Sequence, residues 1–423
     1  MKVKIIHKET ITPSSPTPPH LKTLHLSFMN QLVPEVYVPL LLFFPHPTTH
    51  EKSSILKTSL SEILTHFYPL AGKFQYNDSI CCDDHGAAFV EARVNCRVSK
   101  ILENPDAEML KHLFPAAFES TQALTGHLLL VQVNFFECGG MAIAINISHK
   151  VADAFTLSTF TKIWARVAQG HPVLLPADSF GALTSLYPSQ DFLNASKPLA
   201  EYTQEKCMIR RFVFDASRIA ALQFKAASAS VTNPTRIEAV SALIWKCAME
   251  ASRSNSGSIR PSVCNQPVNM RKRSGKPFVE NVLGNFVWFF KAVTVEGEVD
   301  LQSLVATFRK CMEDFKVNYR NGVSAEQAYQ TIKESAKLLE KEGMDSYTCT
   351  SWCRFPFYET NFGWGKPSWV STPYALKNKF YLMGANDGND IEAYVTLLEE
   401  DMAIFESNQE LLAYASLNPS VIY

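Results

Sequence analysis

Residues 146–155 read NISHKVADAF and place His149 and Asp153 four positions apart, where an apolar run meets a helix-like apolar pattern. A histidine has an ordinary pKa near ~6.5, so it can accept a proton close to neutral pH and act as a general base. Asp153 could support it by bonding the imidazole, or it could turn away and hold the loop through an arginine. On these residues alone, a core histidine beside an ordinary helix N-terminal aspartate is the simpler interpretation.

Sequence patterns that mark other catalytic chemistries are missing. The chain has no serine elbow of the GxSxG type, no cysteine nucleophile motif, no P-loop and no dinucleotide fingerprint. Its ten cysteines show neither a CxxC pair nor a Cys/His spacing typical of metal ligands, so we expect core thiols and no metal site. Proton transfer by His149 is therefore the main chemical hypothesis.

A second segment, SWCRFPFYETNFGWGKPSWV at 351–370, contains three tryptophans, three phenylalanines and two glycines. Gly363 and Gly365 flank Trp364, which predicts a tight loop of defined conformation. An aromatic loop that fills a core is the plainer interpretation of this composition. The basic run RKRSGK at 271–276 could bind phosphate groups, although such runs are more often solvated loops.

The elements that position His149 follow from hydrophobic periodicity. Two strand-like runs, 127–137 and 141–148, flank a Gly-Gly turn and predict a hairpin, and a helix is expected from 154 to Gly170. His149 then lies between a buried strand and a buried helix, which hold it rigidly while it stays accessible. Further strands are expected at 36–44, 207–215, 263–273, 284–295, 379–387 and 390–399, and further helices at 53–70, 216–228, 233–251, 325–343 and 400–416.

Strands and helices alternate in both halves, which predicts an α/β chain in two lobes. Capping boxes at Thr235–Glu238 and Ser324–Gln327 mark two helix starts in the second half. Periodicity fades between 171 and about 205, in a stretch rich in Pro, Ser, Ala and Asp. We therefore expect an N-terminal lobe at 1–180, a crossover linker at 181–205 and a C-terminal lobe at 206–423.

Composition restricts the partners. The 423 residues include 40 basic and 41 acidic side chains, so no overall field favours nucleic acid or an anionic membrane. No apolar run reaches the ~18–20 residues of a membrane helix, and no secretory signal opens the chain. We expect a cytoplasmic protein whose partners are small molecules.

Taken together, these motifs resemble the BAHD acyl-CoA-dependent acyltransferases of plants. HKVAD at 149–153 matches the HxxxD motif of that family, and NFGWG at 361–365 stands where the family has DFGWG. The resemblance covers nearly the whole chain, because other family-like segments follow in the expected order: PSSPTP at 13–18, HFYPLAGK at 66–73, FVEARV at 89–94, FFECGG at 135–140, PTRIEAVSALIWK at 234–246, VNMR at 268–271, GN at 284–285 and SWCRFPFY at 351–358.

The resemblance implies a two-lobed fold like that of chloramphenicol acetyltransferase, with mixed β-sheets and a solvent channel between the lobes. It implies His149 as the general base and an Asp153 that turns away from the channel to pair with Arg271. The loop residues Asn361, Gly363, Trp364 and Gly365 would be structural, although Trp364 is sometimes assigned a role at the oxyanion. No metal or permanent cofactor is implied, acyl-CoA is the co-substrate, and the chain would be a monomer without a covalent acyl-enzyme.

The implied activity is transfer of an acyl group, expected to be acetyl, from CoA to a hydroxyl of a plant specialised metabolite. An amine acceptor, a longer or branched acyl group, and a non-catalytic family member stay open as alternatives. Two departures bear on this choice. Asn361 replaces an aspartate and would weaken any pairing with an arginine such as Arg354, and Asp390 stands where relatives often have glycine.

Overall fold

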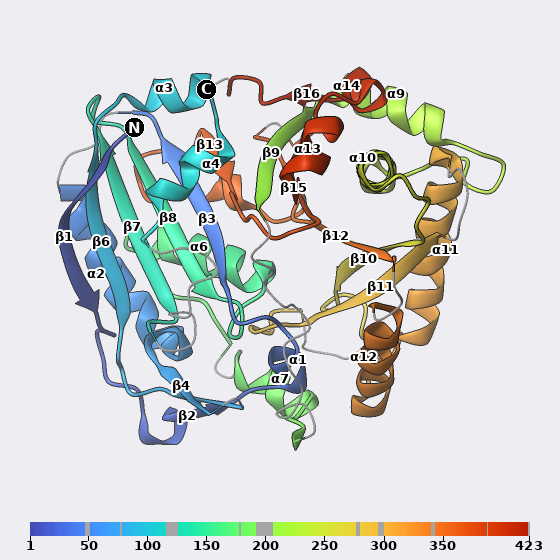
Figure 1. Cartoon of the computed structure of the whole chain (residues 1–423). Helices are drawn as coiled ribbons and strands as arrows, with labels where there is room; N and C mark the ends of the chain where they lie inside the picture. Colours follow the sequence, from blue (N-terminus) through green and yellow to red (C-terminus); the bar gives the residue numbers. More distant parts are fainter. Residues whose placement is uncertain are drawn as a thin grey trace.

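The computed structural model describes residues 1–46, 51–76, 78–115, 126–176, 179–191, 206–275, 280–294, 300–339, 343–386 and 388–421, which are called the described residues from here on. Their strands form one sheet of six strands, one of seven and one of three. In Figure 1 the six-stranded sheet, in blue to green apart from its orange edge strand at residues 369–371, stands beside the seven-stranded sheet, whose strands run from yellow-green to red.

The six-stranded sheet, called the first sheet, carries the hairpin that ends at His149. Its order is β1-β6-β7-β8-β3-β13, with β6 parallel to β7 and the other neighbours antiparallel. The strands are β1 (Val3–Ile11), β3 (Tyr37–Phe44), β6 (Ala87–Val94), β7 (Leu129–Phe136), β8 (Met141–Ser148) and β13 (Trp369–Ser371). Helix α6 (Ala154–Val167) packs against α2 (Glu51–His66) beside this sheet. The predicted hairpin and the helix after it are therefore confirmed.

The seven-stranded sheet, called the second sheet, is also mixed, in the order β11-β10-β12-β14-β15-β9-β16. Its strands are β9 (Cys207–Phe214), β10 (Ser262–Asn269), β11 (Val287–Thr294), β12 (Asp345–Ser351), β14 (Lys379–Gly384), β15 (Ile391–Leu398) and β16 (Ser416–Leu417). One face packs on a helical layer that centres on α10 (Arg236–Ser256), with α9 (Ala216–Ala226), α11 (Leu301–Asn318) and α13 (Glu399–Phe405) around it. The capping box of Thr235 and Glu238 starts α10 as predicted.

The remaining elements are short, apart from helix α12. They are η1 (Pro19–Leu21), β2 (Thr23–His25), α1 (Phe28–Gln31), η2 (Tyr68–Ala71), β4 (Lys73–Tyr76), β5 (Ser79–Cys81), α3 (Val98–Glu103), α4 (Ala107–Leu110), η3 (Lys111–Leu113), α7 (Gly181–Leu186), α12 (Ala325–Leu339), η4 (Phe357–Glu359) and α14 (Gln409–Tyr414). Among the described residues, no helix combines the length and apolar character that crossing a membrane requires.

Several sequence-based boundaries differ from the structure, and two of these differences change where a named residue lies or how many helices form. The strand expected over 263–273 ends at Asn269, so Arg271 lies in the following turn. The single helix expected over 400–416 is split into α13 and α14, because Asn408 accepts a hydrogen bond from the amide of Leu411 and starts a new helix. The linker expected over 181–205 contains α7, and residues 192–205 lie outside the described residues. The division into lobes at 180 and 206 therefore stays a prediction.

The chain returns to the first sheet late in the sequence. Strand β13 pairs with β3, and the Thr372 hydroxyl donates to the carbonyl of Pro39 at 2.9 Å. The indole Nε1 of Trp369 in β13 donates to Glu392 of β15 at 3.1 Å, and Arg211 of β9 binds the same carboxylate at 2.7 and 2.9 Å. This buried cluster joins the two sheets, and residues 372–378 cross between them.

Candidate active site

The turn after β8 is held from several directions. The amide of His149 donates to the carbonyl of Val36 at 2.8 Å, and the side-chain amide of Asn30 donates to the carbonyl of Lys150 at 2.7 Å. The side-chain amide of Asn285 donates to the carbonyl of His149 at 2.5 Å. Three separate segments thus fix the backbone from which the imidazole projects, as a functional side chain requires.

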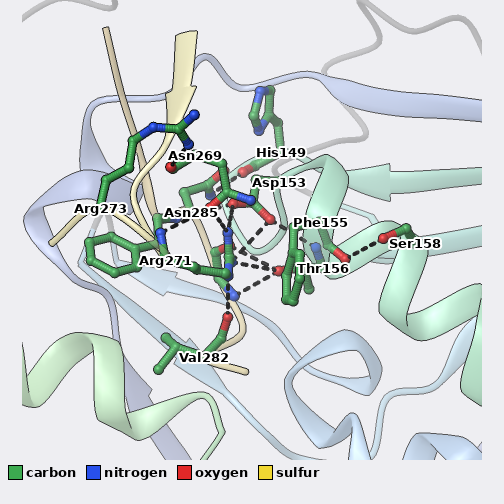
Figure 2. Close-up of polar contacts among 12 residues, drawn as sticks. His149, Asp153, Phe155, Thr156, Ser158, Asn269, Arg271, Arg273, Val282 and Asn285 are labelled. Carbon is green, nitrogen blue, oxygen red and sulfur yellow. Dashed lines mark hydrogen bonds and ion pairs between the residues drawn. The ribbon is translucent and has the colours of Figure 1, made fainter. Parts of the chain in front are cut away.

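Asp153 ends the turn and caps α6. Its Oδ1 accepts a hydrogen bond from the amide of Thr156 at 2.8 Å, the usual arrangement of an N-cap aspartate. Its Oδ2 accepts from the amide of Phe286 at 3.2 Å. The carboxylate is only 3% exposed and is turned toward the segment between β10 and β11, away from the His149 ring (Figure 2).

Arg271 supplies the charge that pairs with Asp153. Its Nη1 lies 2.6 Å from Oδ2 and its Nη2 lies 3.2 Å from Oδ1. Its Nε donates to the carbonyl of Val282 at 2.8 Å, and Nη2 donates to that of Gly284 at 3.1 Å. The guanidinium also lies 4.1 Å from the ring centre of Phe155. The resemblance implied this pairing, and both side chains are fully engaged in it.

The imidazole of His149 differs from the Asp153 carboxylate, whose two oxygens are both hydrogen-bonded. Its Nδ1 is buried and has no hydrogen-bond partner among the described residues. Burial lowers the pKa of His149, and the charge of Lys379 lowers it further, while backbone groups of the turn and Asp153 act in the opposite direction. The ring is therefore neutral and able to accept a proton at neutral pH.

The loop 361–365 is an ordered structural element. The side-chain oxygen of Asn361 accepts from the amides of Gly363 at 2.9 Å and Gly365 at 3.1 Å. Both glycines have φ near +105°, at 104° and 105°, a region that other residues rarely adopt. Trp364 stacks on Phe362 with ring centres 5.5 Å apart. Asn361 thus bonds backbone amides inside its own loop, and no bond joins it to Arg354 among the described residues.

This loop lies far from His149 along α6. The side chain of Gln169, just beyond the C-terminal end of that helix, donates to the carbonyl of Asn361, whereas Asp153 caps the opposite end. The 14 residues of α6 correspond to about 21 Å of helix at ~1.5 Å per residue. The structure brings together His149, Asp153 and Arg271 and keeps Trp364 away from them, which does not support a role for Trp364 at the oxyanion.

Several residues at this site were not identified from the sequence. Asn285, Thr156 and the Phe286 amide complete the contacts of the turn, and Lys379 reaches it electrostatically from β14. The segment GN at 284–285 was the one available signal, and it gave no role. Asp390, noted as a departure, accepts from the amide of Ala216 at 2.8 Å at the start of α9. That position is remote from the chemistry and serves a helix start.

The described residues contain no group of three or more His, Cys, Asp or Glu side chains that could hold a metal ion. The turn itself offers a neutral imidazole on a rigid backbone, and the charge of Lys379 acts on that imidazole. Such a base can accept a proton from a hydroxyl or an amine as that group attacks an acyl carbon.

Comparison with known proteins identifies the family of the chain. The chain matches the Transferase family over residues 1–412. It is 39% identical over 420 residues to akuammiline synthase 1 of Alstonia scholaris, with 97% of each chain covered. It is 35% identical over 450 residues to epi-neemfruitin B 7-O-acetyltransferase of Melia azedarach, covering 99% of this chain and 100% of the relative.

The solved structure of vinorine synthase superposes with a TM-score of 0.86 at 32% identity and with complete coverage of both chains. This match confirms the fold that the motifs imply, an α/β fold like that of chloramphenicol acetyltransferase with mixed sheets. A further relative, BAHD acyltransferase BIA1 of Arabidopsis thaliana, is 36% identical over 436 residues, covering 100% of this chain and 99% of the relative. The chain belongs to the Transferase family of BAHD acyltransferases and is an acyl-CoA-dependent transferase.

Proposed function

We propose that the chain transfers an acyl group from acyl-CoA to a hydroxyl of a small specialised metabolite, with His149 as general base. The observation that carries the proposal is the imidazole itself. It projects from a turn fixed by Val36 and Asn285, its Nδ1 is unpartnered among the described residues, and its pKa is lowered so that it is neutral. A structural histidine of the core would instead spend its ring nitrogens on hydrogen bonds.

The reaction needs no covalent enzyme intermediate. His149 takes the proton of the acceptor hydroxyl while the oxygen attacks the thioester carbonyl carbon, forming the new C–O bond. The tetrahedral intermediate collapses, the C–S bond breaks, and the leaving CoA thiolate recovers the proton from the imidazolium. Protons and charge balance over the cycle. Both substrates are present together in a ternary complex, in a channel between the two lobes.

Asp153 and Arg271 act as support. Both are 3% exposed and bound to each other, so they hold the turn and the segment between β10 and β11 in place. The alternative of a non-catalytic family member rested on Asn361. Because Asn361 accepts the two loop amides through a neutral oxygen, the loop is formed without a carboxylate. This observation weakens that alternative.

Acetyl-CoA is the first donor to test, since one relative is named an O-acetyltransferase. The experiment incubates the purified chain with acetyl-CoA and longer acyl-CoAs against hydroxylated alkaloids, terpenoids and quinones, with amines included. Release of CoA thiol and the mass of the product are measured. We expect His149→Ala to lower the rate by about 10²–10⁴-fold, the usual contribution of a general base.

The matched control is His171→Ala, an exposed histidine just beyond the other end of α6, which should keep the wild-type rate. A His149→Ala variant that still releases CoA at the wild-type rate would overturn the general-base assignment. We also propose that the chain acts as a cytosolic monomer. Light scattering during size-exclusion chromatography tests the monomer and should give a mass near 47.4 kDa.

A further inference from the structure

Lys379 projects from the second sheet toward the first. In β14 the side chains alternate between faces, and Phe380 and Leu382 belong to the core under α10. Tyr381 and Met383 belong to the core of the first sheet instead. Lys379 shares their face, so it lies on the side of the second sheet that is turned toward the first sheet and His149.

The cross-strand row that contains Lys379 consists of polar side chains, whereas the next row on the same face is aromatic. Lys379 is paired with Thr348 of β12 and with Thr396 of β15, whereas the next row on the same face pairs Tyr381 with Tyr394. Thr396 is fully buried, and its Oγ1 has no hydrogen-bond partner among the described residues. A buried hydroxyl without a partner is costly, so this row is suited to a polar ligand group.

No described residue provides a counter-ion for Lys379. Among the described residues no carboxylate lies within ion-pair distance of its ammonium group, and burial lowers the pKa of Lys379 to about 8. Lys150, which is buried, instead donates to the carbonyl of Gln31 at 2.8 Å. The charge of Lys379 reaches His149, whose pKa it lowers. An unpaired cation in such a position favours the binding of an anion from outside.

The position of the Lys379 ammonium group restricts which anion it can bind. In the proposed reaction, the part of the donor that lies at His149 is the acyl group. We infer that Lys379, with Thr396 beside it, binds a free carboxylate at the end of the acyl group, so that the chain binds malonyl-CoA more tightly than acetyl-CoA. The inference rests on the proposed function and narrows its donor. The carboxylate would accept a charge-assisted hydrogen bond from Lys379 and a hydroxyl bond from Thr396.

The test measures dissociation constants by titration calorimetry for malonyl-CoA, acetyl-CoA and butyryl-CoA. Butyryl-CoA is close to malonyl-CoA in length but carries no carboxylate. A charge-assisted hydrogen bond corresponds to about tenfold or more in affinity, so we expect malonyl-CoA to bind at least that much more tightly than butyryl-CoA. Lys379→Met should abolish the difference and leave acetyl-CoA binding unchanged, whereas Lys379→Arg should retain part of it.

Lys272→Met serves as the control, because Lys272 is an exposed lysine in the turn after β10, and it should keep the wild-type ratio. Thr396→Val gives a second variant that leaves the charge in place and should reduce malonyl-CoA binding alone. Equal affinities of the wild-type chain for malonyl-CoA and butyryl-CoA would overturn the inference without any variant. Binding of acetyl-CoA in that case leaves the proposed function intact, whereas failure to bind any acyl-CoA would overturn the proposed function itself.

Discussion

Arg271 binds Asp153 through two nitrogens, with 2.6 Å between Nη1 and Oδ2 and 3.2 Å between Nη2 and Oδ1. The same carboxylate accepts the amides of Thr156 and Phe286. Its oxygens are therefore fully occupied on the side away from His149. The two residues of the HxxxD motif have separate tasks: one presents an imidazole, and the other joins α6 to the segment between β10 and β11.

This pairing predicts that Asp153→Asn lowers stability and activity together. The change leaves the Arg271 guanidinium buried without its counter-charge, which typically costs about 3–5 kcal/mol when one partner of a buried pair is removed. Urea unfolding should show a lower midpoint, and the acyl-transfer rate should fall because the turn is no longer fixed. The urea midpoint and the acyl-transfer rate should therefore both fall.

Asp300→Asn is the matched control. Asp300 also caps a helix, with its Oδ1 accepting from the amide of Ser303 at 2.7 Å, but it pairs with no arginine in the described part of the chain. Since asparagine is also a good N-cap, this variant should change the free energy of unfolding by less than about 1 kcal/mol. A loss of rate in Asp153→Asn with an unchanged unfolding midpoint would contradict the supporting role and place Asp153 in the chemistry.

The junction that carries His149 could be predicted from the sequence because its determinants are local. The alternation of 141–148 and the helical spacing after 154 are set by neighbours in the chain, and the structure places β8 and α6 there. The type and order of the other strands and helices follow from the same periodicity. Boundaries failed where one side chain decides them, as when Asn408 starts α14 in what had been predicted as a single helix.

The surroundings of His149 could not be predicted because they come from distant segments. Asn285 and Lys379 reach the turn from β10–β11 and β14, and neither has a sequence pattern that indicates its register against β8. The resemblance supplied Arg271 as the partner of Asp153, which periodicity could not, since 271 was predicted within a strand. Lys379 lacks a counter-ion among the described residues because of how the strands of the second sheet are arranged around it, and no local sequence pattern indicates that arrangement.

Asn361→Asp should leave the protein nearly unchanged. A carboxylate oxygen can accept the amides of Gly363 and Gly365 as the amide oxygen does, so we expect a change below about 1 kcal/mol in unfolding free energy and the same acceptor preference. Asn361→Ala, by contrast, removes the hydrogen-bond acceptor of both amides and should lower the free energy of unfolding by about 1–3 kcal/mol. Thermal denaturation of both variants separates the two effects. A switched acceptor preference in Asn361→Asp would show that this loop contacts the substrate.

The buried cluster around Glu392 predicts a large loss of stability in Glu392→Gln. The carboxylate binds Arg211 at 2.7 and 2.9 Å and accepts from Trp369 and Tyr394, each at 3.1 Å. Glutamine cannot balance the buried guanidinium, so we expect a cost of about 3–5 kcal/mol in urea unfolding. Because the cluster joins β13 to the second sheet, the loss should be global.

Glu406→Gln provides a direct comparison, since Glu406 pairs with the neighbouring Arg210 at 2.8 Å in a partly exposed position. Exposed pairs contribute about 0–1 kcal/mol, so this variant should unfold close to the wild type. Similar losses in the two variants would show that burial of the Arg211–Glu392 pair does not set its contribution.

The pH dependence of the reaction tests the electrostatics of His149. Because its pKa is lowered from 6.5, the base form persists below that pH, and the acidic limb of kcat/KM with acetyl-CoA should lie below pH 6.5. Lys379 lowers this pKa and Asp153 raises it, so Lys379→Met removes a repulsion on the imidazolium and should shift the limb to higher pH. Rates measured from pH 5 to 9 with wild type and variant decide the matter, because an acidic limb at the same pH in both would mean that the charge of Lys379 does not reach the base.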